Sequence, residues 1–207
     1  MKGLKAISKK VWHFIWEEDS VWSWLANIVI AFILIKFIVY PVLGLMFQTT
    51  HPVVAVVSES MEHDGNFDAW WQKSSAWYTA NGISQEQFAS FPMKRGFNKG
   101  DIMVLRGKNP ESIEIGDIVV FWSSKKDPII HRVVKKWEEK GAYYFQTKGD
   151  NYITNPASIK SIYLDETKIS QDQIIGNAVI RVPFLGYIKI WFVDFINLIL
   201  NLFSQKS

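Results

Sequence analysis

The residues from 21 to 47 form an apolar stretch that constrains this chain more than any other feature. The stretch reads VWSWLANIVIAFILIKFIVYPVLGLMF, in which only Asn27 and Lys36 carry strongly polar side chains. About 20 apolar residues suffice for a helix to cross a hydrocarbon core of about 30 Å, and the helices of soluble domains are typically shorter. The sequence therefore predicts a transmembrane helix over 21–48, preceded by an amphipathic segment over 1–20. A buried helix in a soluble core is the alternative.

The charges around this helix predict its orientation. Lysines precede it at positions 2, 5, 9 and 10, and no Lys or Arg follows it until Lys73. Because basic residues are retained on the cytoplasmic side, we expect a cytoplasmic N-terminus, a helix in the cell membrane and an extracytoplasmic domain over 49–183. Lys36 costs about 2.5 to 3.5 kcal/mol at the centre of a span. It indicates either a partner membrane protein or an amine that snorkels to the surface.

Short runs of β-branched and aromatic residues follow the apolar helix. Turn-forming clusters of Gly, Pro, Asn and Asp separate them, and the pattern does not alternate between strands and helices. It predicts a mainly β fold, an antiparallel β-barrel or sandwich. The sequence contains no cysteine, so this domain depends on its hydrophobic core rather than on disulfides. The expected strands cover residues 53–57, 102–105, 118–122, 129–134, 143–147 and 174–182.

Two segments depart from the β pattern. Residues 62–98 carry many aromatic side chains, with Ser84 and Gln87 placed to begin a helix. We expect a small helical subdomain with its own aromatic core; an aromatic rim on the membrane or over the active site is the alternative. Residues 184–207 are apolar again, but their polar members, among them Asp194, fall on one side of a helical wheel. This favours a C-terminal helix in the membrane interface over a second span.

The charge pattern excludes two other classes of function. The net charge is only +3, and no run of basic residues is dense enough to indicate nucleic acid. His63 and Asp64 are adjacent potential metal ligands, but no matching cluster accompanies them. We therefore expect neither a metal ion nor a cofactor.

The motif SESM at 58–61 places a serine shortly after the predicted membrane helix. A serine hydroxyl is a weak nucleophile unless a base accepts its proton, so Ser60 needs such a partner. Among the histidines, His13 would lie across the membrane, and His63 is too close in sequence for good geometry. His131, within the expected strand IIHRVV, is held rigidly, and an imidazole suits general-base work near neutral pH. A purely structural histidine is the alternative.

Taken together, five segments resemble a known family. VVAVVSESMEH, FNKGDIMVL, IGDIVVFW, IIHRVV and TKGDN occur in the order and spacing class of the type I signal peptidases, in the archaeal and endoplasmic-reticulum form that uses His where bacterial enzymes use Lys. The resemblance covers about 21–182. It implies that Ser60 is the nucleophile, His131 the general base and Asp150 an essential acid that orients the imidazole. It also implies an oxyanion donor in Ser58, for which capping of the local turn is the alternative.

The chain departs from the family pattern in two places. Many relatives carry a second aspartate shortly after the Gly-Asp-Asn box, but here the segment YITNP offers Asn155. An asparagine can orient a histidine, yet it cannot balance the charge of an imidazolium, so Asp150 is the better candidate. The second departure is the aromatic insertion over 62–98.

The resemblance and the membrane position together predict the function. We expect a serine endopeptidase that removes N-terminal signal peptides from exported preproteins, with signal peptides and the lipid membrane as its partners. An extended substrate would bind as an added strand. The alternative is a catalytically inactive membrane-bound β module that binds extended peptides or partner proteins. A self-cleaving domain with a Ser-Lys pair fits less well, because the candidates Lys125, Lys126 and Lys148 are interpreted as solvated charges at strand ends.

Overall fold

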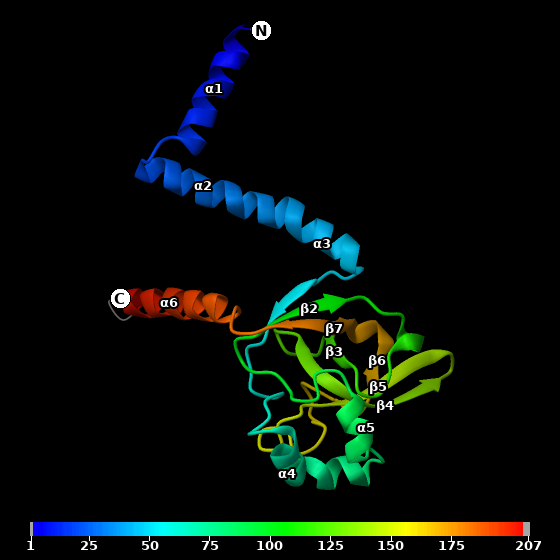
Figure 1. Ribbon diagram of the computed structural model, residues 1–207. Coiled ribbons are helices and arrows are strands. Elements are labelled where there is room, and N and C mark those ends of the chain that lie inside the picture. The colour runs from blue at the N-terminus through cyan, green and yellow to red at the C-terminus, as the bar shows by residue number, and fades with distance from the viewer. Residues whose placement is uncertain (1, 205–207) are drawn as a thin grey trace. The chain divides into compact units, whose positions relative to one another are not determined.

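The computed structural model describes residues 2–204 and divides the chain into two compact units, Met1–Met46 and Phe47–Ser207 (Figure 1). Residue 1 and residues 205–207, which belong to the two expected terminal segments, lie outside the described residues. The first unit is helical, and the second contains the β-sheet with its associated helices.

The predicted apolar helix is present, and all of it except Phe47 lies in the first unit. Its 27 residues Val21–Phe47 form one helical run that is long and apolar enough to cross a membrane, and none of its most apolar window is buried within the protein. The run consists of α2 (Val21–Leu34), a π-helical turn (Ile35–Val39) and α3 (Tyr40–Phe47). Such π-helical turns are rare and appear mostly as single insertions within α-helices.

The polar residue Asn27 has a structural explanation. Helix α1 (Lys2–Trp16) precedes α2, and the last carbonyl groups of a helix have no partner within it. Asn27 Nδ2 donates to the carbonyl of Ile15 at 2.9 Å, and the Ser23 hydroxyl donates to the carbonyl of Phe14 at 2.6 Å. The two polar side chains thus complete the end of α1.

The second unit confirms the prediction of a mainly β, antiparallel fold. Its sheet has seven strands in the order β1-β2-β7-β3-β4-β5-β6, with β1 and β6 at the edges, and it is curled (Figure 1). Only the two-residue β6 has no counterpart among the expected strands. The strands are β1 (Val53–Ala55), β2 (Ile102–Arg106), β3 (Ile118–Phe121), β4 (Ile129–Glu139), β5 (Ala142–Lys148), β6 (Ile169–Ser170) and β7 (Ile174–Val182).

The central strand β3 separates two hydrophobic cores. All four of its residues are buried, and successive side chains of a strand point to opposite faces. Ile118 and Val120 belong to a cluster that includes Met61, whereas Val119 and Phe121 belong to a second cluster on the other face. Burial on both faces fixes the register of β3, and thereby that of the neighbouring β4, because a shift by one residue would exchange the two sets of side chains.

The aromatic insertion contains two helices, as the sequence predicts, and its aromatic side chains form a buried cluster that also includes Val134 of β4. Its helices are α4 (Phe67–Ala80) and α5 (Gln85–Ser90). Both begin at capping residues, because Asn66 accepts from the amide of Ala69 and Ser84 from that of Gln87. The rim alternative is not supported, since most of the aromatic side chains are buried. The buried members of this cluster are Trp70, Trp71, Tyr78, Ile83, Phe88, Phe91 and Val134.

The C-terminal segment is helical over α6 (Tyr187–Ser204). Two short 3₁₀ turns, Pro110–Ser112 and Gln171–Gln173, complete the elements of this unit. Of the residues that the structure describes, only Val21–Phe47 are long and apolar enough to span a membrane. The interfacial placement of α6 stays a prediction.

Candidate active site

Ser60 lies in the loop that follows the edge strand β1. The hydroxyl oxygens of Ser58 and Ser60 are 3.2 Å apart and hydrogen-bonded. Met61, fully buried, anchors the loop in the hydrophobic core beneath β3. The loop therefore holds the two hydroxyl groups side by side, and the buried Met61 fixes its backbone.

His131 sits near the start of β4, opposite Val119 in the register with β3. Its side chain is buried, and its Nδ1 donates a hydrogen bond to Oε1 of Glu166. A carboxylate at Nδ1 selects the tautomer in which Nε2 is free to accept a proton. The imidazole is thus arranged as a general base with its accepting nitrogen on the side away from Glu166.

Glu166 is fully buried and held from several directions. The hydroxyl of Thr147 donates to Oε1 at 2.9 Å, and the amide of Ile159 donates to Oε2 at 2.8 Å. Backbone hydrogen bonds join Glu166 to the same two residues, at 2.9 Å and 2.8 Å. A carboxylate with this many donors has little freedom to turn, so it fixes the orientation of the His131 ring.

A pocket of about 340 Å³ brings the serines and the histidine together. Ser58, Ser60 and His131 all line it, and Ala55 and Ile130 are among its apolar walls. Within the part of the chain that the structure describes, Ser60 and His131 are not hydrogen-bonded to each other. Catalytic hydrogen bonds often tighten only when substrate is bound.

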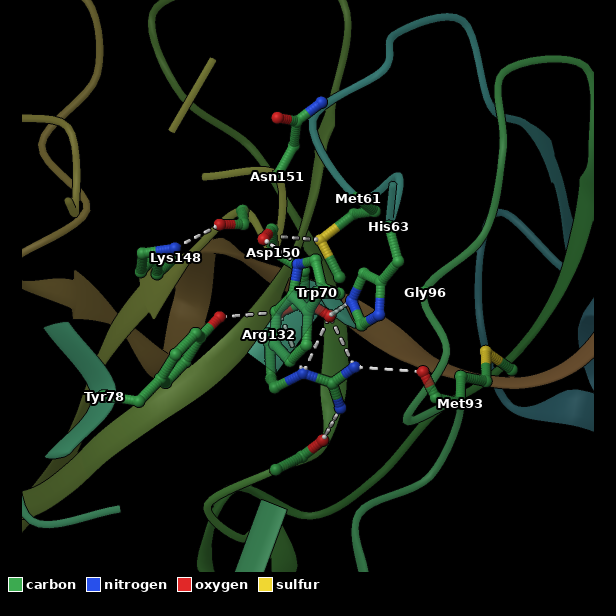
Figure 2. Close-up of polar contacts among 12 residues, drawn as sticks. Met61, His63, Trp70, Tyr78, Met93, Gly96, Arg132, Lys148, Asp150 and Asn151 are labelled. Atoms are coloured by element: carbon green, nitrogen blue, oxygen red, sulfur yellow. Dashed lines mark hydrogen bonds and ion pairs between the residues drawn. The ribbon is translucent and has the colours of Figure 1, made fainter. Parts of the chain in front are cut away.

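Asp150 does not make the expected contact with His131. Among the described residues, its carboxylate accepts from Arg132, Tyr78 and His63, and none of its hydrogen bonds goes to His131 (Figure 2). The Arg132 guanidinium donates through Nε at 3.0 Å and through Nη2 at 2.6 Å. The expected orienting role is therefore corrected, because the buried Arg132 charge takes this carboxylate. The essential role of Asp150 stays a prediction.

The charge of Asp150 is stabilised where it lies. Burial alone would raise the pKa of this carboxyl group, but the Arg132 guanidinium and the hydrogen bond from His63 outweigh burial and hold the pKa well below its usual range. A buried carboxylate paired in this way is typical of a structural ion pair. It forms a site separate from the His131–Glu166 pair.

Asn155, the other expected partner of the histidine, also has different contacts. It is buried and lines the pocket, and its Oδ1 accepts from the hydroxyl of Thr154 at 2.8 Å. It lies against Gly149, where an added Cβ would stand 2.7 Å from the Asn155 Cγ and 2.7 Å from the Ser60 carbonyl oxygen. Glycine in the Gly-Asp-Asn box thus permits close approach of the serine loop.

The interpretation of Lys148 as a solvated strand-end charge is wrong. Its side chain is buried, Nζ donates to the Gly149 carbonyl at 2.7 Å, and the amine lies over the ring of Tyr78. Burial lowers the pKa of Lys148 to about 8, although Asp150 and Glu166 act in the opposite direction. Lys125 and Lys126 are exposed, as expected.

Glu166 is the residue that sequence reasoning missed. The family pattern places a second acid shortly after the Gly-Asp-Asn box, whereas Glu166 follows Asp150 at a longer spacing, just before β6. The available signal was the pair Asp165-Glu166 beside the apolar Leu164, in a chain with few acidic residues after the box. Backbone hydrogen bonds to Thr147 of β5 and to Ile159 bring this segment beside His131.

Comparisons with known proteins identify homologues of this chain. No family model matches it. The signal peptidase complex catalytic subunit SEC11 of Pyricularia oryzae is 36% identical over 101 residues, which are 47% of this chain and 57% of that protein. The same subunit of Colletotrichum graminicola is 37% identical over the same shares, and that of Saccharomyces cerevisiae is 38% identical over 104 residues, 48% and 59%. The match thus spans little more than half the length of these relatives, and it confirms the resemblance predicted from the motifs.

Proposed function

We propose that this protein, a homologue of signal peptidase catalytic subunits, is a membrane-anchored serine endopeptidase that removes N-terminal signal peptides from preproteins. One observation carries the proposal. Ser60 and His131 line a common pocket, and the imidazole is hydrogen-bonded through Nδ1 to the buried Glu166. A nucleophile, a base and a third group that orients the base are the parts of a serine-protease site.

In the proposed mechanism, Ser60 Oγ attacks the scissile carbonyl while His131 Nε2 accepts its proton. The proton then passes from Nε2 to the leaving amine, and water repeats the sequence on the acyl-enzyme. Glu166 takes the orienting role and stabilises the imidazolium that forms. Its negative charge balances the charge of the imidazolium, which an asparagine in this role could not do.

The proposed oxyanion site combines Ser58 with the backbone of Ser60. The Ser58 hydroxyl already contacts Ser60 Oγ at 3.2 Å, so a small rotation would direct its proton toward an oxyanion formed on the attacked carbonyl. Donors of this kind contribute about 2.7 to 4 kcal/mol in other serine proteases. Capping of the local turn is the alternative role of Ser58.

The proposed substrate is an extended peptide that lies along β1. This strand is at the edge of the sheet, so one side of its backbone is available for pairing. The chain runs from β1 directly into the serine loop, and the apolar side chains of Ala55 and Ile130 in the pocket suit the small residues of a signal-peptide cleavage region.

The proposed topology places the N-terminus in the cytoplasm and residues 49–183 on the opposite side of the membrane. Lysines before the apolar helix and their absence directly after it support this orientation. We also propose a membrane protein partner near Lys36 or α6, because the relatives are named as subunits of a complex. Lys36 is the charged residue that lies deepest in the span.

The test is cleavage of a preprotein by the full chain in liposomes. We expect the wild type to release the mature protein and Ser60→Ala and His131→Ala to release none. Full cleavage by Ser60→Ala would refute the catalytic assignment. An inactive wild type that still binds the preprotein would favour the non-catalytic peptide-binding module.

A further inference from the structure

We propose that the aromatic subdomain, residues 62–98, is a positioning element for the serine loop: it holds Asp150 (Figure 2), and the neighbouring Asn151 holds the backbone of Ser60. The inference rests on the proposed function in that Ser60 is the nucleophile. It assigns Trp70 and Tyr78 as positioning residues, which act on the reaction through Asp150.

The first link joins the Gly-Asp-Asn turn to the serine loop. The amide of Asn151 donates to the carbonyl oxygen of Ser60 at 2.9 Å, and its side-chain Nδ2 donates to the carbonyl of Glu59 at 3.0 Å. The amide of Asp150 lies 3.4 Å from the sulfur of the buried Met61. Three consecutive residues of the serine loop are therefore attached to two consecutive residues of the turn.

The second link joins that turn to the aromatic subdomain. The indole Nε1 of Trp70 donates to the carbonyl oxygen of Asp150 at 3.0 Å, and the Tyr78 hydroxyl donates to Oδ1 at 2.9 Å. His63 stacks on Trp70 with ring centroids 3.7 Å apart and reaches Oδ2 at 3.3 Å. The subdomain thus contacts both the backbone and the side chain of Asp150, in a region closed to water.

The third link joins the same carboxylate to the strand of the base. Arg132, which pairs with Asp150, directly follows His131 on β4. Its Nη1 donates to the carbonyls of Pro92 and Gly116, at 2.9 Å and 2.8 Å, and its guanidinium lies over the ring of Phe88. The chain segments that carry the nucleophile and the base are therefore both attached to Asp150. Trp70, Tyr78 and His63 of the aromatic subdomain contact the same residue.

A positioning role and packing alone predict different effects when the indole N–H of Trp70 is removed. A fully buried acceptor that loses its donor carries a cost of desolvation. If the indole N–H of Trp70 were removed, the turn would therefore shift so that the Asp150 carbonyl could find another donor. A shift of about 1 Å at a reacting group costs about 100-fold in rate. Removal of one N–H should therefore slow the reaction more than its effect on folding would suggest.

Trp70 and Trp71 provide a matched pair of variants. They are neighbours in α4, both are buried in the same aromatic cluster, and only Trp70 hydrogen-bonds Asp150. Trp70→Phe and Trp71→Phe each remove an indole from this cluster. We expect Trp70→Phe to lower kcat by about tenfold or more with KM nearly unchanged, and Trp71→Phe to lower the thermal midpoint of unfolding similarly while kcat stays near that of the wild type.

Hydrogen exchange provides a second readout that does not depend on cleavage. Faster amide exchange in the segments 57–61 and 149–155 is expected for Trp70→Phe and for Tyr78→Phe, and not for Trp71→Phe. Equal kcat values for the two tryptophan variants, or unchanged exchange in both segments, would overturn the inference. If Ser60→Ala remained active but exchange responded as expected, the proposed nucleophile would be wrong while the structural link would stand.

Discussion

His131 and Glu166 are hydrogen-bonded through Nδ1 and Oε1 although 35 positions separate them in the sequence. The pair consists of a strand residue and a residue in the connection between β5 and β6, and both side chains are buried. This relationship supplies the third group of the proposed site, and a substitution of Glu166 tests it.

Glu166→Gln should nearly abolish cleavage while the protein stays folded. An amide at this position can donate to Nδ1 and favour the wrong tautomer of His131, so kcat is expected to fall by as much as about 10⁴-fold. Steady-state cleavage of a preprotein measures this loss. Asp165→Asn is the matched control, since Asp165 is exposed and hydrogen-bonds Thr167 instead. Comparable loss in both variants would contradict the assignment.

Asp150→Asn should lower stability as well as activity. The substitution leaves the Arg132 charge buried without its anion, and breaking a buried pair costs about 3 to 5 kcal/mol. Denaturant unfolding of the full chain in detergent measures the free energy of unfolding. Asp64→Asn, which breaks the exposed pair with Lys73, should change it little. If Asp150→Asn were as stable as the wild type, the structural role of Asp150 would be refuted.

Ser58→Ala should slow catalysis without affecting folding. If the Ser58 hydroxyl donates to the oxyanion, its loss is expected to reduce kcat by about 100- to 1000-fold with a smaller effect on KM. Single-turnover cleavage separates the chemical step from product release. An unchanged rate, together with a lower thermal midpoint, would instead support the turn-capping role.

Lys148 should make stability depend on pH in an alkaline window. Its folded pKa of about 8 lies below the ordinary 10.5, with burial as the main cause, opposed by Asp150 and Glu166 and reinforced by Arg132. Between these values the unfolded chain keeps a proton that the folded protein has released. The free energy of unfolding should therefore rise with pH, by up to about 1.4 kcal/mol per pH unit.

The comparison for this prediction is Lys148→Met, measured by denaturant unfolding between about pH 7.5 and 10.5. The stability of the wild type relative to this variant should increase across the window, because only the wild type carries the titrating amine. A constant difference between the two proteins would show that the Lys148 amine titrates normally.

The sequence predicted the features that local pattern controls. The apolar run over 21–47 and the short β-branched and aromatic runs of the strands depend on neighbouring residues, and Ser60 and His131 were found through motifs that belong to such elements. Glu166 was missed because its place beside His131 comes from contacts with segments distant in the sequence, Thr147 of β5 and Ile159. Lys148 was misinterpreted because the rings that its amine faces, those of Trp77 and Tyr78, come from the aromatic subdomain, which is distant in the sequence.

The two candidate acids show why a motif identifies a residue more readily than its role. Asp150 occupies the expected box, yet the neighbouring Arg132 takes its carboxylate. Local sequence contains both residues but not the direction in which each side chain points. Strand alternation places Arg132 and His131 on opposite faces of β4, and this separates the ion pair from the catalytic pair.

The close approach at Gly149 has a mechanical consequence. The gap between the serine loop and the Asn155 loop is set by the missing side chain, because a single added carbon at Gly149 would overlap both. Residue 149 carries only a hydrogen atom in place of a side chain, and this allows the two loops to approach each other closely. An added Cβ would have to displace the Ser60 carbonyl, the Asn155 side chain or both, so the close packing of the serine loop depends on a position that takes no part in the chemistry.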